Sequence, residues 1–216
     1  MIDEDLFAQN LSTVREDIAR EGREDVTIVA VTKGFGASAI ELAARHGLHA
    51  VGENYAQEML EKVVDLESDP DLEVHFIGRV QRNKVRKVAP HVTLWQSVAR
   101  PEILEEISRR CASPSVLIQV RPGDDDSKDG VEPEQVGPML EMASELGVTV
   151  EGLMTIGVLG DPEATRLAFS EVDDLALKFG LTERSMGMSG DYLDALRAGS
   201  TMLRLGSQLF GPRPAR

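Results

Sequence analysis

The chain has 216 residues, and 37 acidic against 23 basic residues leave a formal charge of −14 with the four histidines counted as neutral. With 42% hydrophobic and 28% charged residues, the composition is that of a globular protein with a full core, which excludes a disordered or fibrous chain. The acidic balance argues against nucleic acids or anionic membranes as partners, because these polyanions need a basic face.

The sequence shows no signal for export or membrane insertion. The start MIDEDLFAQN lacks the basic segment and the apolar stretch of a secretory signal, and no apolar run approaches the roughly 20 residues of a membrane span. Its one cysteine, Cys111, cannot form an internal disulfide. These features predict a cytoplasmic protein, and because no apolar seam demands a partner subunit, we expect a monomer.

Eight short apolar, β-branched runs follow an expected N-terminal helix over about 3–21, and we interpret the runs as strands. The expected strands are Val26–Val31, Ala50–Glu53, Val74–Ile77, Thr93–Ser97, Val116–Val120, Val150–Ile156, Arg184–Met188 and Met202–Leu205. The helices expected between them are Ser38–His46, Ala56–Leu66, Asn83–Ala89, Pro101–Arg109, Pro133–Leu146, Pro162–Phe179 and Asp191–Ala198.

Eight strands alternating with helices predict a (β/α)₈ barrel, with a doubly wound open sheet as the alternative. No linker or change of composition divides the chain, so we expect one domain over 1–216. In such a barrel the active site forms at the carboxyl ends of the strands, and phosphate is often held by the loops after strands seven and eight.

Lys33 ends the first expected strand, in the sequence VAVTKGFG. A lysine at the mouth of a barrel is partly desolvated, which lowers the pKa of its amine and favours the neutral nucleophile needed for a Schiff base. The alternative is a lysine that simply reaches solvent at a strand end.

Small residues follow the seventh and eighth expected strands. Ser189 and Gly190 come after one strand, and Gly206 and Ser207 after the other. Backbone amides, hydroxyls and close glycine backbone at one corner of the mouth suit a phosphate dianion. The alternative is that the glycines only form tight turns.

Arg204 lies two residues before Gly206, so strand alternation directs it to the same face. A buried arginine is costly without an acceptor. Its alternative role is a salt bridge inside the barrel with a residue such as Glu53.

Further polar residues follow the second and third strands and could line a pocket. They are Asn54, Tyr55, His75, Gln81 and Asn83. Asn83 could equally be a helix cap ahead of a solvated basic helix, which could also guide an anionic ligand or contact a partner. The four histidines and Cys111 have no metal-ligand spacing, and the run Asp124–Asp126 lacks the periodicity of a calcium loop, so we expect no metal.

Eight sequence motifs, in order and over nearly the whole chain, resemble those of the pyridoxal phosphate homeostasis proteins, whose fold is similar to the barrel domain of alanine racemase. The motifs are VAVTK, VGENYAQE, HFIGRVQRNK, LIQV, KDG, GLMTIG, SMGMSGD and GSTMLRLGSQLFG.

The resemblance implies that Lys33 forms a Schiff base with pyridoxal 5′-phosphate (PLP). It also implies that Ser189, Gly206 and Ser207 hold the phosphate, that Arg204 faces the pyridine nitrogen and that Asn54 lies beside the cofactor. The chain departs from the family pattern at 34–36, Arg79, Gln96, Ala99 and Arg121, and we expect these departures to alter the loops around the mouth.

Two functions are consistent with this resemblance. The first is a carrier that buffers PLP and hands it to PLP-dependent apo-enzymes. The second is an amino-acid racemase or related lyase. An arginine at the pyridine nitrogen weakens the cofactor as an electron sink, and we expect no counterpart of the additional β domain from which relatives of the alanine racemase kind supply a tyrosine. The sequence therefore favours the carrier and, with it, a protein that is not an enzyme.

Overall fold

The computed structural model describes residues 2–63, 71–121, 123 and 129–212, and its strands close into a parallel barrel in the order β1 to β8. The strands are β1 (Thr27–Val31), β2 (Ala50–Glu53), β3 (Glu73–Phe76), β4 (Leu94–Val98), β5 (Ser115–Gln119), β6 (Thr149–Met154), β7 (Glu183–Ser185) and β8 (Met202–Leu205). Because β1 pairs with β8, from Thr27 against Met202 to Ala30 against Leu205, the sheet has no open edge there. The (β/α)₈ prediction is confirmed, and the open doubly wound sheet is excluded.

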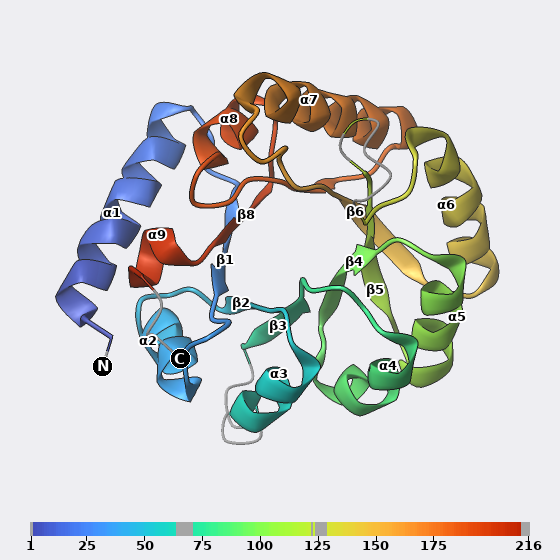
Figure 1. Cartoon of the computed structure of the whole chain (residues 1–216), viewed down its shortest axis with the longest axis horizontal. Helices are drawn as coiled ribbons and strands as arrows, with labels where there is room; N and C mark the ends of the chain where they lie inside the picture. Colours follow the sequence, from blue (N-terminus) through green and yellow to red (C-terminus); the bar gives the residue numbers. More distant parts are fainter. Residues whose placement is uncertain (1, 64–70, 122, 124–128, 213–216) are drawn as a thin grey trace.

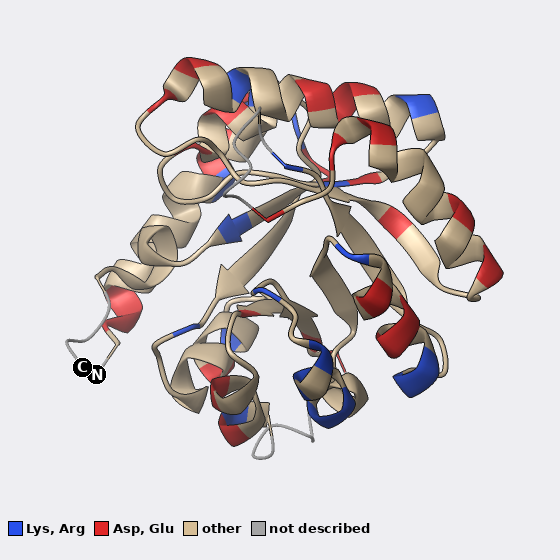
Figure 2. Ribbon diagram, turned by 45° about the vertical axis from the view of Figure 1, so that its right-hand side comes forward, with Lys and Arg blue, Asp and Glu red and all other residues tan. Residues whose placement is uncertain are grey.

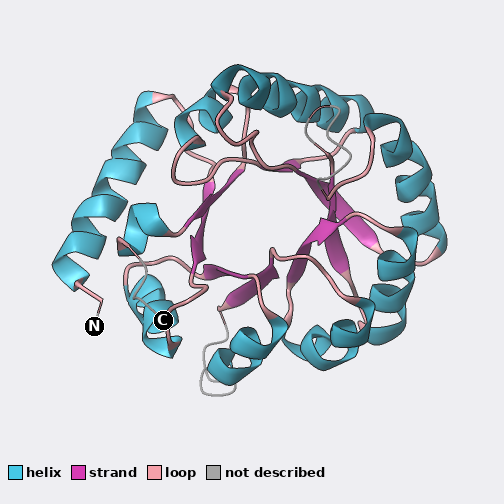
Figure 3. Cartoon of the chain, viewed as in Figure 1, coloured by secondary structure: helices cyan, strands magenta, loops and turns pink. Residues whose placement is uncertain are grey.

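Helices surround the ring of strands, and α1 lies outside β1 and β8 (Figures 1 and 3). The α-helices are α1 (Glu4–Arg20), α2 (Ala37–Arg45), α3 (Ala56–Val63), α4 (Arg82–Val88), α5 (Pro101–Arg110), α6 (Val136–Glu145), α7 (Pro162–Phe179), α8 (Tyr192–Arg197) and α9 (Ser207–Phe210). Single 3₁₀ turns η1 (Ala89–His91) and η2 (Pro133–Gln135) follow α4 and precede α6. Most of the charged residues lie on these helices, whereas the strands carry few of them (Figure 2).

Most expected elements match the observed ones within a few residues. The end of the expected helix Ala56–Leu66 lies outside the described residues. β7 is shorter than expected, ending at Ser185, and Gly187 two residues later has a φ of 90° that strands do not use. The four-residue helix α9 was not expected from the sequence, because it is too short to show a helical period.

Two apolar clusters lie on opposite sides of the barrel wall. The smaller cluster fills the barrel interior, and the larger one packs between the strands and the helices. The interior cluster consists of Val29, Ala50, Leu94, Leu117, Met154 and Met202. Because side chains alternate along a strand, this cluster fixes which other residues point inward, including Arg204 two residues after Met202.

No helix of the described residues is long and apolar enough to cross a membrane.

Candidate functional site at the mouth of the barrel

A cavity of ≈ 480 Å³ opens at the carboxyl ends of the strands, where barrel enzymes place their sites. All six residues proposed from the sequence to contact a cofactor line it: Lys33, Asn54, Ser189, Arg204, Gly206 and Ser207. They come from the ends of β1, β2, β7 and β8, which are far apart in sequence but adjacent in the closed barrel. The fold thus brings every one of these side chains or backbone segments to a single cavity.

Lys33 lies in a tight turn directly after β1. The Phe35 amide donates to the Thr32 carbonyl oxygen at 3.0 Å, so residues 32–35 form a β-turn with Lys33 at its second position. Gly34 at the third position has a φ of 80°, as a type II turn requires and as side chains other than glycine rarely adopt. The glycine that departs from the family pattern therefore permits this turn.

Arg204 points into the barrel and is 3% exposed. Its Nη1 donates to the Ser185 carbonyl (2.6 Å) and hydroxyl (2.7 Å) oxygens, and its Nη2 donates to the Thr155 carbonyl oxygen (2.8 Å). Burial lowers the pKa of Arg204 from its ordinary value to about 10, and the nearby Asp191 carboxylate partly offsets this effect. Because this pKa is still far above neutral, the guanidinium keeps its charge.

The alternative salt bridge between Arg204 and Glu53 is wrong. Ala50 points into the barrel, so Glu53, three residues later, points outward to the helices. There it binds Lys62 of α3, with 2.6 Å between Lys62 Nζ and Glu53 Oε1. Strand alternation would have predicted that Glu53 points outward if the sequence had shown which residues of β2 face the barrel interior.

A chain of hydrogen bonds crosses the barrel interior behind Arg204. The Ser185 hydroxyl donates to Gln96 Oε1 (2.7 Å), and Gln96 Nε2 donates to His75 Nδ1 (2.7 Å). His75 therefore faces the barrel interior and does not line the mouth cavity. Gln96, expected to alter a loop, instead lies in the barrel and fixes the serine that binds Arg204.

The loops after β7 and β8 are joined to each other. The Gln208 amide donates to the Ser189 hydroxyl oxygen at 3.0 Å. Gly206 lies beside the end of β1, where a Cβ added to it would make an ordinary contact, at 3.4 Å, with the Val31 carbonyl oxygen. Ser189, Gly206 and Ser207 thus line one corner of the cavity together.

Asn54 carries an orphaned polar atom. Its Oδ1 is buried without a hydrogen-bond partner, and its backbone packs so closely on Gly78 that a Cβ there would overlap the Asn54 carbonyl oxygen. Because buried polar atoms are normally hydrogen-bonded, an unsatisfied one in a cavity wall is where a ligand group fits.

Gly190, expected beside Ser189 at the phosphate corner, also lines the cavity. The other lining residues were not expected from the sequence to contact a cofactor. They are Val31, Ile77, Gly78, Arg79, Gln119, Asp129, Met154, Ile156 and Met188. Most lie at the ends of strands. The sequence shows that position, but it does not show which of the residues there face the cavity. Arg79 pairs with Asp129, with 3.3 Å between Nε and Oδ1, so this departure from the family pattern joins two loops at the mouth.

The remaining candidates are distributed elsewhere. Tyr55, Gln81 and Lys84 line a smaller pocket beside the mouth that shares Asn54 with it. Asn83 lies within α4 rather than at its N-cap, which is Gln81. No group of three or more potential metal-ligating side chains occurs in the described parts of the chain, and the run Asp124–Asp126 lies outside them.

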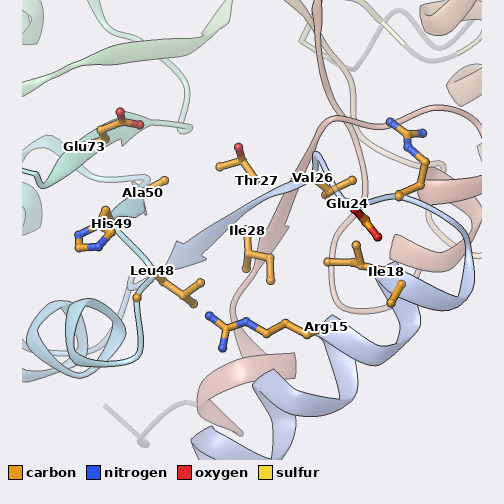
Figure 4. A pocket seen from close by; sticks show the side chains of 13 residues that line it. Arg15, Ile18, Glu24, Val26, Thr27, Ile28, Leu48, His49, Ala50 and Glu73 are labelled. Carbon is orange, nitrogen blue, oxygen red and sulfur yellow. The ribbon is translucent and has the colours of Figure 1, made fainter.

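A second cavity, of ≈ 520 Å³, lies at the opposite end of the barrel between α1 and the starts of β1 to β3. Figure 4 shows the Arg15 side chain extending from α1 toward Leu48, with His49 and Glu73 on the far side. Arg15 donates to the His46 carbonyl oxygen, and Arg23 donates to the carbonyl oxygens of Leu196 and Ser200. Both arginines are therefore used to hold neighbouring backbone segments together. The larger volume of this cavity does not by itself make it a ligand site.

Comparison with known proteins agrees with the fold and the motifs. A family model described as "Alanine racemase, N-terminal domain" matches residues 2–214. Proteins named pyridoxal phosphate homeostasis protein are 40% identical in Synechocystis sp. (87% of this chain, 92% of the relative) and 38% identical in Deinococcus radiodurans (93% and 97%).

Solved structures give the same result. PipY of Synechococcus elongatus without PLP is 33% identical with a TM-score of 0.87, and the same protein with PLP bound is 32% identical with a TM-score of 0.83; each match covers 95% of this chain and 100% of PipY. An alanine racemase of Clostridium difficile shares the fold at 16% identity and a TM-score of 0.78, and the match covers 99% of this chain and 58% of the racemase. The chain therefore belongs to the family of pyridoxal phosphate homeostasis proteins.

Proposed function

We propose that this protein binds PLP reversibly as a Schiff base on Lys33 and acts in PLP homeostasis as a carrier or buffer. The observation that carries the proposal is the convergence of Lys33, Asn54, Ser189, Arg204, Gly206 and Ser207 on one cavity. The cavity volume of ≈ 480 Å³ is in the range of small-molecule sites. PipY, which has been solved with PLP bound, supports the same ligand.

Each residue has a role that its surroundings suit. Lys33 supplies the amine from a turn at the end of β1. Ser189, Gly206 and Ser207 hold the phosphate where the two joined loops meet. Arg204 faces the pyridine nitrogen with a charge fixed by three hydrogen bonds, and Asn54 offers its orphaned Oδ1 to the ring side of the ligand.

PLP supplies a reactive aldehyde and, when its ring nitrogen is protonated, a strong electron sink. A guanidinium that stays charged donates a hydrogen bond to that nitrogen and keeps it unprotonated. Because this weakens the electron sink, the site favours holding the cofactor over carbanion chemistry.

The second candidate function is an amino-acid racemase or related lyase, which needs another acid or base on the opposite face of the substrate. Of the two tyrosines, Tyr192 donates to Asp17 Oδ2 at 2.6 Å, between α8 and α1. Burial, and then this contact, raises the pKa of Tyr192 to about 12. Tyr55 is 55% exposed in the neighbouring pocket and stays available. Because the Tyr192 hydroxyl is bound to Asp17 and does not line the mouth cavity, Tyr192 does not supply the second acid or base, and this favours the carrier.

The first test is the visible absorption spectrum of the protein mixed with PLP, followed by borohydride reduction and peptide mapping. We expect one reduced adduct, on Lys33. Absence of any adduct would overturn the proposal.

A second measurement separates carrier from enzyme. We expect no exchange of amino-acid α-hydrogens in deuterated water at substrate-scale rates. Rapid exchange would establish the racemase or lyase instead.

The proposal extends to partners and location. We infer that PLP-dependent apo-enzymes receive the cofactor from a monomeric, cytoplasmic carrier. Activation of an apo-enzyme by the loaded protein, faster than by the same concentration of free PLP, would support direct transfer. Equal rates would indicate release into solution, and size-exclusion chromatography tests the monomer.

A further inference from the structure

A buried ionic cluster lies on the outer side of the barrel wall, behind the turn that carries Lys33. Lys62 Nζ of α3 is 2.6 Å from Glu53 Oε1 of β2 and 2.7 Å from Glu58 Oε1, one helical turn earlier. The side chains of Lys62 and Glu53 are 5% and 0% exposed. None of the three lines the mouth cavity.

This cluster binds the peptide groups on both sides of Lys33. Lys62 Nζ donates to the Thr32 carbonyl oxygen at 2.7 Å, and the Gly34 amide donates to Glu58 Oε1 at 2.5 Å. The Thr32 hydroxyl also donates to Glu53 Oε1 at 2.5 Å. Two ends of one turn are therefore tied to the same helix and strand.

Stability alone does not explain this cluster, because removing charged groups from water costs free energy that their attraction often only offsets. Burial raises the pKa of Glu53, and Lys62 counteracts this. A buried ion pair often contributes no more stability than apolar residues of similar size. What apolar residues could not supply here is a donor for Thr32 and an acceptor for Gly34.

The turn needs such contacts because of its glycine. Gly34 adopts a φ of 80°, and glycine has more backbone freedom to lose than any other residue. Without the contacts from α3, the direction in which Lys33 leaves the strand would be less fixed. A reactive amine displaced by about 1 Å reacts far more slowly.

We propose that Lys62 and Glu58 are positioning residues that hold the Thr32–Phe35 turn, so that the Lys33 amine is aimed at the aldehyde of bound PLP. This inference rests on the proposed function and deepens it. It separates the formation of the covalent bond from the binding of the phosphate, which the loops after β7 and β8 hold on the other side of the cavity.

The test compares Glu58→Ala with Glu58→Gln, because glutamine keeps an oxygen for the Gly34 amide. Total bound PLP is measured by equilibrium dialysis, and the rate of Schiff-base formation by stopped-flow absorbance and borohydride trapping on Lys33. We expect Glu58→Ala to bind PLP within about twofold of the wild type but to form the adduct about tenfold more slowly. Glu58→Gln should recover most of that rate.

A double variant removes the two most buried charges together. Lys62→Met with Glu53→Met takes away the donor to the Thr32 carbonyl oxygen and leaves Glu58, whose side chain is 21% exposed, as the remaining charge of the cluster. We expect this variant to fold and to show a loss of adduct rate like that of Glu58→Ala. The matched control is Glu61→Ala on the same helix, which removes only an exposed contact with Gln57 and should change nothing.

The outcomes are distinguishable. Equal loss of bound PLP and of adduct rate would show a structural role and overturn the inference, as would wild-type rates in both Glu58→Ala and the double variant. If the wild-type protein forms no adduct on Lys33, the proposed function fails and the inference with it. Slow adduct formation at normal PLP binding, rescued by Glu58→Gln, is the result that supports it.

Discussion

The two ends of the barrel both hold arginines and a cavity of similar size, but the side chains are used differently. At the amino-terminal end, Arg15 and Arg23 bind backbone carbonyl oxygens of the surrounding loops and helix ends. At the mouth, Arg204 is held by the backbone from behind, while Asn54 keeps an unsatisfied oxygen in the cavity wall. One end closes the fold, and the other presents polar groups to a ligand.

The difference shows which observation identifies a site in a barrel. The amino-terminal cavity is slightly larger, at ≈ 520 Å³ against ≈ 480 Å³. Among the described residues that line it, however, none has a buried side-chain polar atom without a hydrogen-bond partner, whereas Asn54 at the mouth has one. Substitutions at the two ends should therefore have different effects. Those at the mouth should change PLP binding, and those at the other end should change the free energy of unfolding.

The largest effect is expected at Lys33. Lys33→Ala removes the amine that forms the Schiff base, so borohydride should trap no adduct. The side chain lies at a strand end outside the apolar core, so we expect a melting temperature within about 2 °C of the wild type. A trapped adduct in this variant would assign the reaction to another lysine.

Arg23→Ala should give the opposite result. It removes hydrogen bonds from a charged group to the carbonyl oxygens of Leu196, Gly199 and Ser200. We expect the free energy of unfolding to fall by about 2 kcal/mol in urea titration, with the PLP dissociation constant unchanged. Arg166→Ala, at an exposed arginine 3.8 Å from Asp194, is the control and should be nearly neutral. A weaker PLP affinity in Arg23→Ala would contradict the separation of the two ends.

The fold was predictable from the sequence because its signals are local. Short runs of four to six residues, rich in apolar side chains, mark every strand except the three-residue β7. The boundaries of α7 follow from Pro162 in the first turn and from Gly180, which caps the helix with a φ of 67°. That the six residues lie together at the mouth was also predictable, because the strand ends of a closed barrel meet at one place.

The direction of Glu53 and the role of Lys62 were not predictable. β2 is buried on both faces, so its sequence shows no alternation from which to read the phase of the strand. Lys62 reaches Thr32 across thirty positions of sequence, and no local pattern reports such a contact. The turn at Lys33 likewise depends on the positive φ of Gly34, which the sequence permits but does not require.

Tyr192→Phe tests the outer layer beside α1 and should act on stability alone. Loss of the hydrogen bond to Asp17 should cost about 1.5 kcal/mol at neutral pH. Because the pKa of Tyr192 rises from 10.0 to about 12 on folding, its contribution is complete below pH 10 and is lost as the pH rises toward 12. Urea titrations from pH 9 to pH 12 should therefore show a smaller fall in stability for the variant. An equal fall in both proteins would contradict the assignment.

The smallest effect is expected at the phosphate side of the mouth, in Ser189→Ala. The change removes a hydroxyl proposed to bind the phosphate and the acceptor of the Gln208 amide, while Gly206 and Ser207 stay in place. We expect the PLP dissociation constant to rise about fivefold, or about 1 kcal/mol, with Ser170→Ala on the exposed side of α7 as the neutral control. An unchanged dissociation constant would remove Ser189 from the phosphate site. Because Lys33 and its turn are untouched, the amount of adduct trapped at saturating PLP should equal that of the wild type, which distinguishes weaker phosphate binding from a misdirected amine.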